Sequence, residues 1–562
     1  MLATDNRALA ADYDVLIVGS GYGGAITAAR LGYANRIADR GLRIAVLERG
    51  DEHPTGSFPD REAEMFCKVR NSYNPLGLYE FLHFRDIDVI QGCGLGGSSL
   101  INANVAIEPE AEVLRSGWPR PLMDEAADGR LARYYRRAFD MLDVVPFAEK
   151  QGLRKAGVFS EAIRGAGGRA EAMRLAVSDR ERVTRYGAHR RPCINCGGCV
   201  TGCNVGAKST LAQNYLPMAH HYGVEMFPGI EVLTVGEGAD GQYRVLVRRY
   251  HRPDGMQWQE QVVTARIVVV AAGSLGSSGI LLRSRAAGLS LSPRVGHSFS
   301  GNGDFIALAY NTDQMTDILG FGGDVGPRAE VRAGPTITFG ARLTTRLPGL
   351  RGHFLVEDLS CPRALADLLR CGLSALTPVL DPLRPRGWDD VTRWRRDLLM
   401  WDSRGAANHT LGFLIMGHDT ADGRIVLEGE RPTIQWPDVG SDEIYRVINQ
   451  VLRDGSQPLG GMYIENPRWH RALGRGLITA HPLGGCAAAD DVAGGVVDHR
   501  GRVFRDDGRV HDNLFVVDGS VIPRALGVNP FMTISAFAER SAEHLRRDLG
   551  LPPYDENDER HD

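Results

Sequence analysis

The chain of 562 residues is too long for one simple hydrophobic core and indicates two or three domains. A formal net charge of −4 gives no electrostatic basis for binding nucleic acid or an anionic membrane surface. No apolar run reaches the roughly 20 residues that a membrane-spanning helix needs. The first residues lack a charged-then-apolar signal pattern, so we expect a cytoplasmic protein.

A strand, a glycine-rich turn and a helix are predicted near the N-terminus. Residues 15–18 form a β-branched and aliphatic run, as in a strand buried on both faces of a parallel sheet. Gly19, Gly21 and Gly24 follow in the pattern G-x-G-x-x-G, with a helix expected from about Gly23. The first glycine permits a tight turn, the second lets a pyrophosphate approach the backbone, and the third lets the helix pack on the strand.

A second strand, residues 44–47, ends in an acid, Glu48. Its carboxylate can accept hydrogen bonds from both hydroxyls of an adenosine ribose and would repel a 2′-phosphate. A glycine pattern alone also occurs in ordinary turns. The strand, turn, helix and acid together predict a dinucleotide site. Downstream, the glycine-rich loop GCGLGGSSLINANV leads to Asn102 and Asn104.

Four of the nine cysteines are clustered with the spacing C-x2-C-x2-C-x3-C: Cys193, Cys196, Cys199 and Cys203. This spacing is close to the run that holds an iron–sulfur cluster in bacterial ferredoxins, although Asn204 replaces the usual proline. Thiolates in C-x2-C pairs also bind zinc, and free cysteines also pack as small apolar residues. The sequence leaves all three alternatives open. Lys208, just beyond, has two alternatives, a capping or pairing role in this segment and a solvated charge, and the solvated charge is the favoured expectation.

The C-terminal half contributes two further motifs. His481 lies in TAHPLGGC, where Pro482 fixes the local backbone. A group that titrates near neutral pH, placed at an alcohol hydroxyl, can take up or orient its proton while hydride leaves the carbinol carbon. Asn529 precedes Pro530 in GVNPF, just ahead of a predicted helix. Its amide is either a simple helix cap or a hydrogen-bond donor to a bound substrate or cofactor.

From about Tyr13 to about Leu549 the chain resembles the glucose–methanol–choline (GMC) oxidoreductases, most closely their cholesterol oxidase branch. The resemblance rests on the N-terminal fingerprint and on GLGGSSLINANV, AAGSLGSS, HPLGGC and DGSVIP…GVNPFMTISAFAER. It implies an α/β fold: a Rossmann-like FAD-binding domain with an interleaved α+β substrate domain that carries a large β-sheet. The expected FAD-binding segments are 10–120, 200–305 and 475–550. The expected substrate segments are 120–200 and 305–475, and 551–562 form a polar tail.

The resemblance also implies roles for individual residues. His481 and Asn529 are expected at the active site, with Glu357 as a base above the flavin. Asp358 follows directly, and because consecutive strand residues face opposite sides, only one of these acids can point at the site. The expected cofactor-binding residues are Gly19, Gly21, Tyr22, Gly23, Gly24, Glu48, Gly94, Gly96, Gly97, Ser98, Asn102, Val105, Val232, Ala272, Gly273, Asp518, Gly519, Asn529, Pro530 and Phe531. SSLINANV has no histidine, so non-covalent FAD is expected.

The sequence thus predicts an FAD-dependent enzyme that oxidises the CH–OH group of a hydrophobic alcohol, sterol-like or a natural product. Hydride would pass to flavin N5, and O2 or another acceptor would reoxidise the flavin. A lyase or decarboxylase of the same fold is the alternative, because fold does not fix function. The expected partners are the alcohol and the acceptor. The stretch 361–405 is expected to form either amphipathic helices on the substrate domain or a weak membrane-surface element.

Overall fold

The computed structural model describes residues 1–148, 152–251, 255–322, 332–380, 387–399, 404–470 and 474–555. Its largest sheet has the order β10-β2-β1-β13-β12-β11, and β23 pairs with both β13 and β22. The strands are β1 (Asp12–Val18), β2 (Ile44–Glu48), β10 (Glu225–Pro228), β11 (Ile230–Glu237), β12 (Tyr243–Tyr250), β13 (Trp258–Val270), β22 (Arg502–Phe504) and β23 (Val510–Val516). β1, β2, β10, β13 and β23 pair in parallel. Residues 15–18 are buried, as expected for a central parallel strand.

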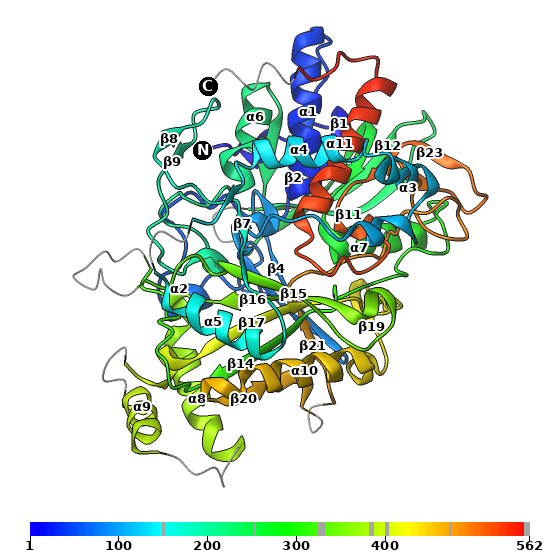
Figure 1. Cartoon of the computed structure of the whole chain (residues 1–562). Coiled ribbons are helices and arrows are strands. Elements are labelled where there is room, and N and C mark those ends of the chain that lie inside the picture. The colour runs from blue at the N-terminus through cyan, green and yellow to red at the C-terminus, as the bar shows by residue number, and fades with distance from the viewer. Residues whose placement is uncertain are drawn as a thin grey trace.

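Helices from the N-terminal, middle and C-terminal parts of the chain cover this sheet (Figure 1). They include α1 (Tyr22–Ala38), α4 (Ala132–Met141), α6 (Tyr215–His221), α7 (Gly273–Ala286) and α11 (Phe531–Asp548). α1 packs against α6 and α11, while α7 packs against β11. The guanidinium of Arg30 on α1 forms a buried ion pair with Glu539 on α11 at 2.7 Å. The N-terminal and C-terminal segments are therefore joined in one layer.

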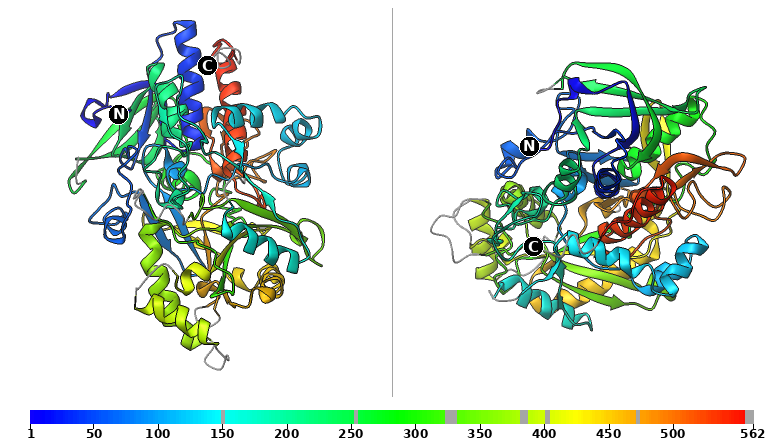
Figure 2. Two further views of the ribbon diagram at one scale, coloured as in Figure 1. Left: turned by 60° about the vertical axis from the view of Figure 1, so that its left-hand side comes forward. Right: turned by 90° about the horizontal axis from the view of Figure 1, so that it is seen from above.

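A six-stranded antiparallel sheet forms the second layer, with the order β20-β14-β17-β16-β15-β6. Its strands are β6 (Glu171–Ala172), β14 (Phe305–Tyr310), β15 (Phe339–Thr344), β16 (His353–Leu359), β17 (Leu411–Met416) and β20 (Met462–Glu465). Two helices, α5 (Arg154–Gly165) and α10 (Glu443–Ser456), pack on it and on each other. Figures 1 and 2 show this layer beside the first sheet. The fold is the predicted α/β type with a second, sheet-rich part.

A three-stranded sheet with the order β21-β4-β3 places two loops of the site next to each other. It consists of β3 (Tyr79–His83), β4 (Ile87–Gly92) and β21 (Leu477–Thr479). β4 and β21 pair in parallel, with Val89 opposite Thr479. Parallel neighbours end at the same edge of a sheet. The glycine-rich loop after β4 and the segment that carries His481 after β21 therefore begin side by side.

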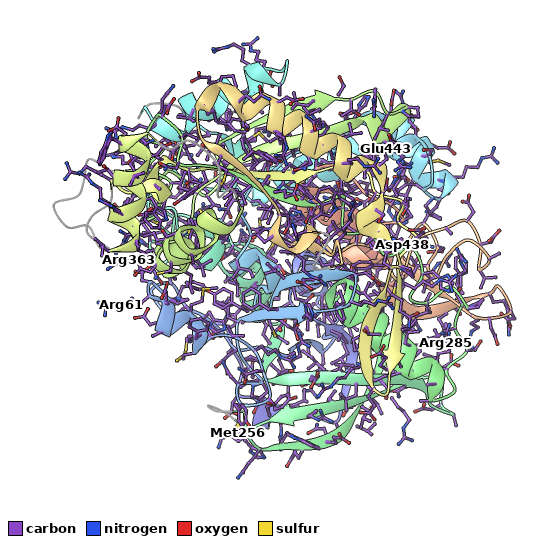
Figure 3. The ribbon with its side chains drawn as sticks, turned by 90° about the horizontal axis from the view of Figure 1, so that it is seen from below. Arg61, Met256, Arg285, Arg363, Asp438 and Glu443 are labelled. Atoms are coloured by element: carbon purple, nitrogen blue, oxygen red, sulfur yellow. The ribbon has the colours of Figure 1, made fainter. Side chains whose placement is uncertain are left out.

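The remaining elements lie around these sheets. The short ribbons are β5 (Val145–Pro146) with β7 (Arg174–Leu175), β8 (Arg182–Val183) with β9 (His189–Arg190), and β18 (Arg424–Glu428) with β19 (Arg431–Gln435). The other helices are α2 (Glu62–Phe66), α3 (Arg120–Ala127), α8 (Arg363–Leu380) and α9 (Trp388–Leu398). α8 packs on α2 and α9. Figure 3 shows Arg61 and Arg363, next to the starts of α2 and α8, at one edge of the molecule.

The stretch 361–405 forms the helices α8 and α9, which project at the lower edge of Figure 1. Residues 381–386 and 400–403 within it lie outside the described residues, as does the predicted polar tail beyond residue 555. Within the described ranges, no helix combines the length and apolar character needed to cross a bilayer.

The interleaving of two domains remains a proposal, and the sheets support most of it. Segments 10–120, 200–305 and 475–550 supply the strands of the first sheet, and 305–475 supplies most of the second. Segment 120–200 divides between them, because α4 packs on α11 whereas α5 packs under the second sheet. We propose that this segment forms a connection between the two domains.

Candidate active site

A cavity extends along the ends of the first-sheet strands and collects segments that are far apart in sequence. Most of the predicted site residues line it: Gly19, Gly21, Tyr22, Gly23, Glu48, Gly97, Ser98, Asn102, Val105, Val232, Ala272, Gly273, His481, Asp518, Gly519, Asn529, Pro530 and Phe531. Four others lie outside the lining: Gly24, Gly94, Gly96 and Glu357. Ligands of open α/β sheets commonly bind in such a crevice at the carboxyl ends of the strands.

The fingerprint glycines occupy positions that a side chain could not share. A Cβ on Gly19 would lie 2.3 Å from the carbonyl oxygen of Ala271, and one on Gly24 would lie 1.9 Å from that of Gly19. Gly21 instead faces open space within the cavity. The three positions therefore have the geometry of a tight turn, an exposed backbone and a close helix–strand contact, as the sequence predicts.

Ser20, which the sequence analysis did not identify, fixes the side chain of Glu48 in the cavity wall. The Ser20 hydroxyl donates to Glu48 Oε2 at 2.6 Å and accepts from the backbone N–H of Gly96 at 2.9 Å. Gly50 N–H donates to the other Glu48 oxygen at 2.9 Å. Ser20 thus ties the fingerprint turn to the glycine-rich loop, and Gly94 and Gly96 lie behind the lining rather than in it.

Another part of the cavity wall carries aromatic and amide groups. The rings of Tyr22 and Phe531 stack with their centroids 5.1 Å apart. The Asn102 amide donates to the Tyr22 hydroxyl at 2.8 Å, and burial raises the pKa of that hydroxyl. The Nδ2 atom of Asn104, also in the lining, is buried without a hydrogen-bond partner among the described residues. A buried amide donor of this kind indicates a polar ligand atom at the cavity wall.

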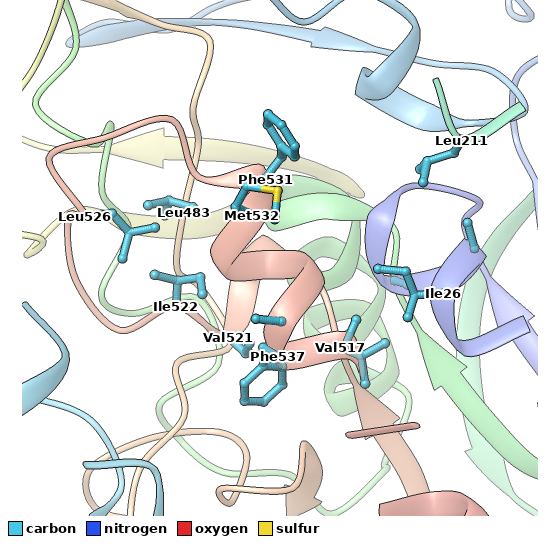
Figure 4. Packing of buried hydrophobic residues seen from close by; sticks show 14 of the residues in the cluster. Ile26, Leu211, Leu483, Val517, Val521, Ile522, Leu526, Phe531, Met532 and Phe537 are labelled. Carbon is cyan, nitrogen blue, oxygen red and sulfur yellow. The ribbon is translucent and has the colours of Figure 1, made fainter. Parts of the chain in front are cut away.

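The first turn of α11 orders the loop around Asn529. Figure 4 shows Leu483, Ile522 and Leu526 gathered beside this turn, with Phe531 pointing away from them. Leu483 and Ile522 are fully buried. This packing joins the segment after His481 to the segment before Asn529, so the two residues are held by one apolar cluster.

His481 is held by a carboxylate that sequence reasoning missed. Its Nδ1 lies 2.9 Å from Oδ1 of Asp304, and Asp304 is buried. The backbone N–H of His481 also donates to the Thr479 hydroxyl at 2.9 Å. The imidazole is mostly buried, with 15% of its side chain exposed at the cavity.

Asn529 contacts Glu357, a residue of β16 in the second sheet. Nδ2 of Asn529 donates to Glu357 Oε2 at 3.3 Å. Oε1 of Glu357 and Oδ1 of Asn529 have no hydrogen-bond partner among the described residues. Burial raises the pKa of Glu357 to about 8. Glu357 is fully buried within β16, not at the surface. Asp358 accepts instead from Thr338, so the two neighbouring acids face different surroundings.

This raised pKa predicts a pH-dependent stability. Between about pH 4.5 and 8 the folded chain binds the Glu357 proton more tightly than the unfolded chain does. The free energy of unfolding therefore falls as the pH rises through this window, by on the order of 5 kcal/mol from this group. Glu357→Gln removes the titration, so its Tm should fall less than the wild-type Tm between pH 5 and 9 in calorimetry. Parallel Tm curves would contradict the prediction.

The segment 300–304 organises both halves of the site. Asn302, with a φ of 58°, accepts from the backbone N–H groups of Leu526 and Gly527 and donates to the Val528 carbonyl at 2.9 Å. It therefore holds the loop that presents Asn529. Asp304, two residues on, holds His481. The sequence signal was the run SGNGD, whose polar and glycine residues indicate a turn but not its contacts.

The four clustered cysteines all line a second, small cavity of about 20 Å³, which has room for about one water molecule. Within the described ranges, no group of three or more His, Cys, Asp or Glu side chains is arranged to hold a metal ion. The iron–sulfur and zinc alternatives therefore lack support. Burial raises the pKa of the Cys196 thiol to about 12. This environment favours the packing alternative.

Lys208 also lines this second cavity, and the expectation of a solvated charge is wrong. The residue is buried, and its Nζ donates to the carbonyls of Asn102 at 2.6 Å and Cys199 at 3.0 Å. Burial lowers its pKa to about 8. Lys208 thus connects the cysteine segment to the glycine-rich loop.

Known proteins match this chain over most of its length. Models of the GMC oxidoreductase family match residues 13–301 and 449–538. A cholesterol oxidase of Mycobacterium tuberculosis is 30% identical, with 94% of this chain and 90% of that protein aligned. One of Acinetobacter baumannii is 28% identical over 95% and 94%. The formate oxidase of Aspergillus oryzae, solved to study FAD modification, matches with a TM-score of 0.63 at 15% identity, covering 96% and 99%. The chain belongs to the GMC oxidoreductase family.

Proposed function

We propose that this chain is an FAD-dependent oxidoreductase that oxidises the CH–OH group of a hydrophobic alcohol to a carbonyl. The observation that carries the proposal is one cavity that joins the dinucleotide fingerprint and Glu48 to His481 and Asn529. The cholesterol oxidases among its relatives support a sterol-like or similar apolar substrate.

The cavity fits FAD by the chemistry of its walls. Gly21 and Gly273 present backbone to open space, where a pyrophosphate can approach. The unpaired amide of Asn104 and the carboxylate of Glu48 supply a donor and an acceptor at different positions in the wall. Residues 98–105 contain no histidine, so we propose that the cofactor is held without a covalent bond.

FAD, when bound, supplies the acceptor for the hydride of the carbinol carbon. The side chains of the protein bind the substrate hydroxyl group and accept its proton. Because Nδ1 of His481 is engaged by Asp304, Nε2 is the ring atom that remains for the substrate hydroxyl. With its proton on Nδ1, the imidazole can take up the hydroxyl proton at Nε2 as the carbonyl forms.

Asn529 lines the cavity, and Glu357 lies directly behind it, hydrogen-bonded to its amide; we propose that this pair acts on the same oxygen from the other side. A neutral Glu357 can donate a hydrogen bond through the oxygen that has no partner among the described residues, whereas an ionised one can only accept. We propose that below about pH 8 the neutral carboxyl and the Asn529 amide together orient the alcohol. An ionised Glu357 above that pH would serve as a second base.

Anaerobic reduction of the bound flavin tests the proposal. The purified protein is mixed without oxygen with cholesterol in detergent micelles, a long-chain primary alcohol and a small hydrophilic alcohol, and the flavin absorbance is followed. We expect an apolar alcohol to bleach the flavin. Admission of air, or of a dye acceptor if air is ineffective, should restore it and so separate oxidase from dehydrogenase activity. Product formation without bleaching would support the lyase or decarboxylase alternative instead.

Two measurements on the same sample complete the test. Protein that is colourless and cannot be reconstituted with FAD would contradict the proposal outright. Iron and zinc are measured by elemental analysis, and we expect less than one equivalent of either metal because the cysteine cavity lacks a metal-holding arrangement.

A further inference from the structure

We propose that Asp304 is the positioning residue that fixes the tautomer of His481, with the ring proton on Nδ1 and the lone pair of Nε2 available to the substrate. This inference rests on the proposed function for its kinetic consequence. The tautomer itself is a property of the protein side chains and can be measured independently of any reaction.

Both oxygens of Asp304 have defined partners. Oδ1 lies 2.9 Å from Nδ1 of His481. Oδ2 accepts from the Thr479 hydroxyl at 2.9 Å and from the backbone N–H of Ala480 at 3.0 Å. These two donors come from the residues just before His481 in the chain. The carboxylate is therefore held at both ends and cannot rotate to exchange its oxygens without breaking three hydrogen bonds.

The surroundings of Asp304 favour a hydrogen-bond acceptor for the histidine. The carboxyl group is buried, and its Oδ2 accepts from a hydroxyl and a backbone N–H, so its other known partners are hydrogen-bond donors. An ionised carboxylate only accepts hydrogen bonds, so the ring nitrogen that faces it must carry a proton. Neutral imidazole has one N–H, and Nε2 is then the acceptor. The same logic applies to the buried aspartate of Ser-His-Asp triads.

The pair also connects two parts of the fold. Asp304 directly precedes β14 of the second sheet, and His481 follows β21 of the three-stranded sheet. A single hydrogen bond between residues 177 positions apart thus sets the position of the imidazole relative to the second sheet. A displacement of the second sheet would move the imidazole with it.

Asp304→Asn tests the inference because an amide has the shape of a carboxylate, but one of the two acceptor oxygens is replaced by an NH2 group that donates. Its oxygen satisfies the Thr479 and Ala480 donors best, which places its NH2 against Nδ1 of His481. An NH2 group donates, so Nδ1 must become the acceptor and the ring proton must move to Nε2. We expect kcat to fall on the order of 10²-fold with KM changed much less, because the proton acceptor has become a donor.

The tautomer is read directly by 15N NMR of the ring nitrogens in the FAD-loaded protein, labelled at histidine, with the His481 signals assigned by their absence from His481→Gln. The wild type should show a protonated Nδ1, and Asp304→Asn a protonated Nε2.

Asp419→Asn is the matched control. Asp419 is also buried and accepts from Ser300 and Gly303 in the same turn, but does not touch His481. It should change Tm and leave the His481 tautomer as in the wild type.

The outcomes separate this inference from the proposed function. A wild-type His481 protonated on Nε2 would overturn the inference, as would Asp304→Asn with an unchanged tautomer or with kcat within about threefold of the wild type. An alcohol panel that never reduces the wild-type flavin would overturn the proposed function alone, because the NMR result would still decide the tautomer. If Asp304→Asn failed to fold, Asp304→Glu would replace it. Its longer carboxylate keeps the Nδ1 proton, so a protonated Nε2 there would overturn the inference.

Discussion

His481→Ala is expected to lower kcat/KM for the alcohol about 10³-fold while the flavin content and Tm stay near those of the wild type. The variant removes the ring nitrogen proposed to take up the hydroxyl proton, and a positioned general base contributes roughly 10²–10⁴-fold to such a step. Stopped-flow measurement of flavin reduction under anaerobic conditions reports the chemical step directly. The variant leaves Asp304 with its Thr479 and Ala480 donors, so the fold should persist.

A matched variant tests whether the loss of activity is specific to the position of His481. His83 forms a second histidine–aspartate pair, with Asp88 at 2.8 Å, but its side chain is 77% exposed and it does not line the cavity. His83→Ala should leave flavin reduction within about twofold of the wild type. Undiminished turnover of His481→Ala would contradict the proposed role and return the non-oxidative alternative to consideration.

Gly24→Ala is expected to yield protein without bound flavin. The added methyl carbon would lie 1.9 Å from the carbonyl oxygen of Gly19 and 3.3 Å from a methyl group of Ile17. The first contact is with backbone, so α1 must move away from β1, and the turn at Gly19 opens. Because the backbone of that turn is the proposed pyrophosphate site, the flavin absorbance per protein should fall to near zero and Tm should fall with it.

The control for this substitution is Gly157→Ala. Gly157 lies within α5, where an added Cβ meets nothing within 4 Å. Alanine in a helix interior is favoured over glycine by up to about 1 kcal/mol, so this variant should keep its flavin and melt at the same or a higher temperature. Retention of full flavin by Gly24→Ala would show that the helix can shift without opening the turn.

Much of the site could be predicted from the sequence where its parts are neighbours along the chain. The turn at Gly19, the acid at the end of β2 and the asparagine before α11 each follow from local rules for strands, turns and helix starts. Asp304 could not be found in this way, because its partner lies 177 positions away and no local pattern joins them. Ser20 is similar, since its partner Gly96 lies in another loop.

Tertiary packing decided the other differences. The alternation of side chains along a strand predicted that only one of Glu357 and Asp358 would face the site. The register of β16 in its sheet determined which of them does. The burial of Lys208 depends on two loops that close over it, so composition alone suggested a solvated charge. The cysteine spacing left an iron–sulfur cluster, zinc and simple packing open, because spacing along the chain does not specify how the thiols are arranged in space. Among the described residues the four cysteines line a small cavity without a metal-holding arrangement.

The position of β23 has a consequence for how the protein matures. This strand comes from residues 510–516, yet it completes the first sheet beside β13, and α11 follows it. Until residues 510–516 have been made and have paired with β13, one wall of the crevice is missing, even though the N-terminal turn is already present. The crevice for the proposed flavin therefore closes only after this late segment has folded. We expect a chain truncated before residue 510 to bind no flavin.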